Sequence, residues 1–245
     1  MSLNKNLEDR VRFFFDNVNI LDEDIERAKR AIFSKGVEKH IIILEKLKAW
    51  NQSEKVDYSL VASTYRYDKR IRNALFKFIS YLEEYYRSII LDYYRFDWSG
   101  IKLNNQLKKE LEKHNDMNAA LEQILFSSLV NQIILIKDNI QDRFIFPNSK
   151  YLKENIDALI ELRNAVMHNK LLVLYRGFKE CYLNDNEFSR STTLKDNVIN
   201  LIRFLPEEIR NACEEEINNC AIERNNENKT AWELPSVVAI NLTNC

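Results

Sequence analysis

The scarcity of glycine and proline is the feature that most constrains the fold of this chain. Its 245 residues include only three Gly and three Pro, whereas average usage is about 7% and about 5%. Folds with many strands need these residues in their tight turns. The sequence therefore predicts an all-α fold. It also excludes P-loop and Rossmann nucleotide sites, because neither Gly-rich pattern occurs in it.

The charges of the chain are nearly balanced, with 36 Lys and Arg against 37 Asp and Glu. The protein has no net positive charge that would attract nucleic acid through counterion release. RNA binding would therefore depend on a local basic patch. The 45% of hydrophobic residues are enough for a buried core.

The cysteines and the N-terminus predict a cytoplasmic protein. The four cysteines are widely spaced without a CxxC pair, and MSLNKNLEDR lacks the layout of a signal peptide. No apolar run reaches the ~20 residues of a membrane span, so no membrane contact is expected. His40 and His114 have no partners at metal-ligand spacing, so neither a metal site nor a cofactor is expected.

Apolar residues recur at helical spacing through most of the chain. We predict three parts: an N-terminal helical segment 1–57, a helical domain 58–235 and a C-terminal tail 236–245. Thr193 with Asp196 predicts a helix start, and Pro206 predicts the next one. The helices expected before these are 22–51 with a break near Gly36, one long helix 67–94 ending at 97–100, then 103–114, 118–140 and, after a break at Pro147, 150–170.

The segment 150–170 places an arginine in an apolar setting. A helical wheel puts Arg163 in the middle of its apolar stripe. A guanidinium stays charged and is costly to bury alone, so Arg163 needs an anionic partner, a cleft or an interface. Asn164 and His168 lie four residues apart on one edge of the stripe, within reach of Arg163. The stripe consists of Leu152, Ile156, Leu159, Ile160, Val166 and Met167.

Arginine, asparagine and histidine together suffice to cut RNA without a metal. An imidazole, with an ordinary pKa of about 6.5, exchanges protons at neutral pH. A guanidinium binds phosphate, and an asparagine orients the imidazole or the ribose. The 2′-OH of RNA would be the nucleophile, so DNA should be spared.

The segment LIELRNAVMHN, with Arg163, Asn164 and His168, resembles the RNxxxH signature of the HEPN superfamily of helical RNases. Upstream, a stretch with Asp68, Arg72, Glu84 and Arg87 is similar to the helix that precedes this signature in Abi-like proteins of phage abortive infection, of the AbiD and AbiF type. The resemblance covers about residues 58–175. It implies a HEPN-like helical bundle with a long central helix.

The resemblance also implies an activity and partners. The motif would form a metal-independent endoribonuclease site that is completed when two copies dimerise, in a protein acting in phage defence. RNA is then the substrate and a second copy of the chain a partner, and some relatives act with a small non-coding RNA. Lys170 and Arg176 follow the motif and are candidates for RNA binding.

A second function remains open beside the enzyme. The same fold could serve as a non-catalytic module that binds RNA or a protein, with Arg163 and His168 in structural roles. The tripeptide that starts the motif is not rare in this chain, because Arg72 and Arg210 also begin Arg-Asn-Ala without the later histidine. Arg87 lies at ion-pair spacing from Glu83 and Glu84, and a salt bridge is expected there rather than an RNA contact.

Overall fold

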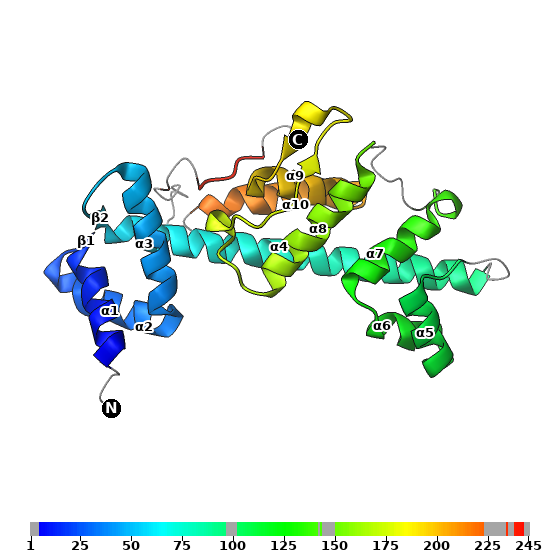
Figure 1. Cartoon of the computed structure of the whole chain (residues 1–245), viewed down its shortest axis with the longest axis horizontal. Helices are drawn as coiled ribbons and strands as arrows, with labels where there is room; N and C mark the ends of the chain where they lie inside the picture. The colour runs from blue at the N-terminus through cyan, green and yellow to red at the C-terminus, as the bar shows by residue number, and fades with distance from the viewer. Residues whose placement is uncertain are drawn as a thin grey trace. The chain divides into compact units, whose positions relative to one another are not determined.

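The computed structural model describes residues 5–96, 102–141, 143, 150–222, 234 and 238–242. This part of the chain is mostly helical, as predicted, with four strands of two residues each (Figure 1). No helix in it is long and apolar enough to cross a membrane. The expected breaks at 97–100 and at Pro147 lie outside these residues, as does half of the expected tail 236–245.

The described residues form ten α-helices, five short 3₁₀ helices and four strands. The strands pair as β1 with β2, parallel, and as β3 with β4, antiparallel. The bounds are α1 Lys5–Asp16, β1 Val18–Asn19, α2 Ile25–Lys35, α3 Val37–Asn51, β2 Val56–Asp57, α4 Tyr58–Phe96, α5 Asn105–His114, α6 Met117–Gln123, α7 Phe126–Leu135, α8 Leu152–Met167, β3 Cys181–Tyr182, β4 Arg190–Ser191, α9 Leu194–Phe204 and α10 Glu207–Asn218.

The chain divides into two compact units. The first unit comprises 1–72, 171–174 and 219–240, and the second comprises 73–170, 175–218 and 241–245. The division along α4 falls between Arg72 and Asn73.

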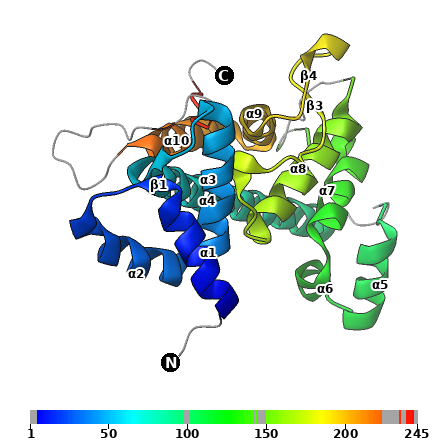
Figure 2. The ribbon, with the colours of Figure 1, turned by 60° about the vertical axis from the view of Figure 1, so that its left-hand side comes forward.

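The first unit is a helical cluster in which α3 packs against both α1 and α2 (Figure 2). Its core includes the fully buried side chains of Phe14, Leu44, Leu47 and Val61. Gly36 joins α2 to α3 with a φ of 98°, a conformation that glycine adopts without steric cost. The predicted break near Gly36 is thereby confirmed.

A buried ion pair in the first unit involves two residues of the upstream stretch. The Asp68 side chain is fully buried, and its Oδ2 lies 3.1 Å from Nη2 of Arg72 one helical turn later. Its Oδ1 accepts a 3.2 Å hydrogen bond from the backbone N–H of Val173. Burial raises the pKa of Asp68, against the opposing effect of Arg72. This pair anchors the short segment 171–174 on α4.

In the second unit, α8 packs against α7, α9 and β3. The buried side chain of Asn155 donates to the carbonyl of Tyr182 at 3.0 Å and accepts from its N–H at 2.7 Å. Asn200 of α9 donates to the backbone carbonyl of Asn155 at 2.8 Å. Buried polar groups with satisfied hydrogen bonds fix orientation. These bonds therefore hold α8 in place against β3 and α9.

Two helix predictions differ from the structure. The single helix expected over 118–140 is wrong, because Ile124 and Leu125 are extended and separate α6 from α7. Ile124 is buried and Leu125 is 66% exposed, so packing rather than glycine or proline sets the break. The long helix α4 begins at Tyr58, nine residues before the expected start, because Val61 and Tyr65 pack into the first unit.

The predicted helix starts near residues 193 and 206 are confirmed. The Thr193 hydroxyl oxygen accepts a 3.1 Å hydrogen bond from the N–H of Asp196 at the start of α9. It also donates to the Asp196 carboxylate at 2.8 Å. Pro206 directly precedes α10, where its missing N–H costs nothing.

Candidate active site on α8

The buried face of α8 differs from the expected apolar stripe, so Arg163 does not lie in its middle. Leu152, Ile160 and Met167 are only partly buried, while the polar Asn155 is inside. The expectation was wrong because it counted apolar residues alone, and Asn155 is buried with its hydrogen bonds satisfied. Arg163 lies at the border of the buried face. That face consists of Asn155, Ile156, Ala158, Leu159, Leu162, Ala165 and Val166.

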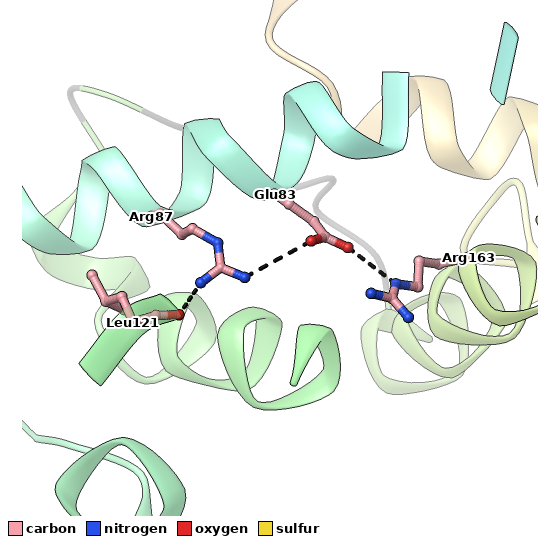
Figure 3. Close-up of polar contacts among 4 residues, drawn as sticks. All are labelled: Glu83, Arg87, Leu121 and Arg163. Carbon is pink, nitrogen blue, oxygen red and sulfur yellow. Dashed lines mark hydrogen bonds and ion pairs between the residues drawn. The ribbon is translucent and has the colours of Figure 1, made fainter. Parts of the chain in front are cut away.

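Of the three settings expected for Arg163, the structure provides an anionic partner. Its Nε donates a 3.0 Å hydrogen bond to Oε1 of Glu83 on α4 (Figure 3). Its Cζ lies 5.7 Å from the ring centroid of Phe126, a cation–π distance. The side chain is 27% exposed. Within the described part of the chain, its two terminal amino groups make no hydrogen bond, so they are available to a ligand.

Glu83 lies between two arginines. One carboxylate oxygen binds Arg163, and the other lies 3.8 Å from Nη2 of Arg87 (Figure 3). Arg87 also donates to the backbone carbonyl of Leu121 in α6. The predicted Glu83–Arg87 pair is confirmed, and Glu83 in addition fixes the guanidinium of Arg163.

His168 ends α8 and faces solvent. It is the C-terminal cap residue of the helix. Asn169 follows in the left-handed region with a φ of 54°, and the N–H of Lys170 donates to the carbonyl of Ala165 at 3.0 Å. This is a Schellman motif, in which asparagine takes the left-handed position more easily than most residues. Among the described residues, nothing hydrogen-bonds to the His168 imidazole.

The expected cluster of Arg163, Asn164 and His168 is not joined by any side-chain hydrogen bond or ion pair within the described residues. Asn164 and His168 share the outer face of α8, whereas the side chain of Arg163 points toward Glu83 on α4. Five helical positions separate Arg163 from His168, which rotates their side-chain directions by about 140°. One copy of α8 therefore presents its arginine and its histidine in different directions.

Glu161 of α8, an acid not singled out from the sequence, lies on the face of Asn164 and His168. Glu161 accepts a 2.5 Å hydrogen bond from the hydroxyl of Tyr175. This bond raises the pKa of Tyr175. The spacing of Glu161, three residues before Asn164, could have indicated a shared face. Its bond to Tyr175 could not be read from the sequence.

Lys170 and Arg176, the candidates for RNA binding, are both exposed in the second unit. Lys170 directly follows the turn that ends α8, so its position is fixed relative to His168 by the Schellman motif. Their role in RNA binding stays a prediction.

The histidines outside α8 occupy separate settings. His40 is buried and stacked on Tyr65, with ring centroids 4.6 Å apart. His114 lies 3.5 Å from the carboxylate of Glu110. No group of three His, Cys, Asp or Glu that could hold a metal ion occurs among the described residues.

Comparison of the chain with protein-family models, with curated proteins and with solved structures gives no match.

Proposed function

We propose that this protein is a metal-independent endoribonuclease of the HEPN type, in which Arg163 binds the scissile phosphate and His168 moves the proton. One observation carries the proposal. Glu83 binds Arg163 through Nε alone, so both terminal amino groups of Arg163 make no hydrogen bond within the described residues. The exposed imidazole of His168 makes none there either. A guanidinium fork and a solvent-facing imidazole on one helix provide the two groups that RNA cleavage needs.

The chemistry follows from these two groups. The imidazole takes the proton of the 2′-OH, whose oxygen attacks the adjacent phosphorus. The guanidinium stabilises the negative charge that builds on the phosphate oxygens. The bond from phosphorus to the 5′-oxygen breaks, and that oxygen takes up a proton. The products are an RNA ending in a 2′,3′-cyclic phosphate and an RNA beginning with a 5′-OH.

The proposed enzyme is a homodimer. The two groups of one α8 point about 140° apart, and the reaction needs one group to remove a proton and another to supply one. A two-fold arrangement that pairs Arg163 of one copy with His168 of the other would bring both groups to one phosphate. We expect light scattering to show a dimer at micromolar concentration. An active monomer would contradict this part of the proposal.

The cleavage assay that tests the proposal uses an RNA and a matched strand with 2′-deoxyribose throughout. We expect cleavage of the RNA in the presence of EDTA, with 2′,3′-cyclic phosphate ends, and no cleavage of the deoxy strand, because the attacking hydroxyl is missing. Mass spectrometry of the fragments identifies the ends. Products with 3′-OH ends, or activity lost in EDTA, would rule out this mechanism.

The biological role that we propose is the cleavage of cellular or phage RNA in the cytoplasm during abortive infection, with a small non-coding RNA as a candidate partner. The support for this role is the resemblance of residues 58–175 to Abi-like proteins. The trigger and the sequence of the RNA substrate are separate questions for infection experiments.

A non-catalytic module of the same fold, which binds RNA or a protein, is the second candidate. The observation in its favour is the ion pair of Arg163 with Glu83, because a neutralised arginine can serve packing alone. Such a module would bind RNA without cutting it. Variants of Glu83 and Arg163 separate the two candidates.

A further inference from the structure

A cavity of about 250 Å³ lies in the first unit. Its walls come from α2, α3 and the first two turns of α4. Three alanines, Ala28, Ala31 and Ala62, line it where larger side chains would fill it. Its volume corresponds to about eight waters at about 30 Å³ each. That is room for a phosphate group with a sugar ring attached.

The inner wall of the cavity is aromatic and rigid. The His40 imidazole stacks on Tyr65 with ring centroids 4.6 Å apart and an interplanar angle of 17°. Its Nδ1 lies 2.8 Å from the carbonyl oxygen of Gly36. A carbonyl only accepts, so Nδ1 carries the proton and donates. In the neutral ring, Nε2 is then left as an acceptor for a hydroxyl group.

Positive charge prevails around the cavity. Arg27, Lys35 and Arg66 line it, against a single carboxylate, Asp24. Arg27 and Lys35 form no ion pair with any residue that the structure describes. Burial lowers the pKa of Lys35, and the charges of Arg66 and Lys69 lower it further. Arg66 is therefore close enough to Lys35 for their charges to repel, and an anion between them would relieve this repulsion.

We propose that this cavity binds a phosphomonoester attached to a sugar. Arg27 and Lys35, which form no ion pair with any described residue, match the charge of about −1.5 to −2 that a phosphomonoester carries near pH 7. The aromatic wall and the His40 acceptor fit a sugar with free hydroxyl groups. A free sugar phosphate and the 5′-terminal phosphate of an RNA share this chemistry. The site is independent of the proposed nuclease function.

Isothermal titration calorimetry on the full chain tests this site with ribose 5-phosphate as the probe and ribose as the uncharged control. We expect saturable binding of ribose 5-phosphate and none of ribose. Arg27→Gln and Lys35→Gln should each raise the Kd about 10- to 100-fold, the range for a lost hydrogen bond to a charged group. Both side chains are exposed, so the fold should persist.

Arg30→Gln is the matched control, because Arg30 is an exposed arginine of α2 that does not line the cavity. Its Kd should stay within about twofold of the wild-type value. Ala62→Leu, which fills the cavity but leaves every charge in place, should abolish binding in protein with a normal circular dichroism spectrum. No saturable binding at millimolar ribose 5-phosphate, or an equal loss in Arg30→Gln, would overturn the proposal.

The source of the phosphate is distinguished by a second pair of probes. A 2′-O-methyl RNA pentamer, which resists attack by its own 2′ oxygens, is titrated with a 5′-phosphate and with a 5′-OH. Binding of the phosphorylated pentamer more tightly than ribose 5-phosphate assigns the site to RNA ends. Binding of ribose 5-phosphate alone assigns it to free sugar phosphates. Either result supports a phosphomonoester site.

Discussion

His168→Ala should lower RNA cleavage by about 10²–10⁴-fold, the range for removal of a general acid–base group. The side chain is exposed and makes no hydrogen bond within the described structure, so the fold does not depend on it. The loss should appear in the rate of a single-turnover reaction, where binding and product release do not limit the rate. The midpoint of thermal unfolding should stay at the wild-type value.

His114→Ala is the control for this variant. His114 ends α5 in the same unit and has a carboxylate neighbour, Glu110, but no place in the proposed site. Its cleavage rate should equal that of the wild type. An unchanged rate in folded His168→Ala protein would exclude His168 as a catalytic group. The non-catalytic module would then be the better description of the chain.

The parts of the fold that the sequence predicts well are those set by local chemistry. Gly36 breaks a helix because its backbone takes a positive φ, and Thr193 starts one because its hydroxyl caps the N–H of Asp196. The break at Ile124 and Leu125 has no such local cause. The break follows from packing, which buries one of two adjacent apolar residues and exposes the other. Helix propensities do not predict such a choice.

In the candidate site, too, the sequence predicts what local chemistry requires but not what the packing of distant residues decides. The need for an anionic partner, a cleft or an interface beside Arg163 follows from the cost of a lone buried charge, and the structure provides the first of these three. The identity of that anion does not follow, because Glu83 lies 80 residues earlier in the chain. The position of Arg163 at the border of the buried face was missed for a different reason. Asn155 is buried as a hydrogen-bonded polar residue, and an apolar wheel leaves it out.

Glu83→Gln and Arg163→Gln should have opposite effects on RNA cleavage, although both remove the same ion pair. In Arg163→Gln the phosphate loses its cationic partner, so the cleavage rate should fall by about 10²-fold or more. In Glu83→Gln the amide oxygen can still accept from Nε of Arg163, and the guanidinium loses a competing negative charge. Cleavage should therefore increase.

The stabilities of the two variants test whether the ion pair has only a structural role. If it has, the cleavage rate should fall in proportion to the free energy of unfolding. The pair is partly exposed, with 27% and 17% of the side chains accessible. Each substitution should thus cost only about 1 kcal/mol in the free energy of unfolding. Urea denaturation measures this cost in the same preparations that are assayed for cleavage. Equal losses of stability with opposite changes in cleavage assign Arg163 to the phosphate. Cleavage that falls in both variants in proportion to their stability would assign the ion pair to the fold alone.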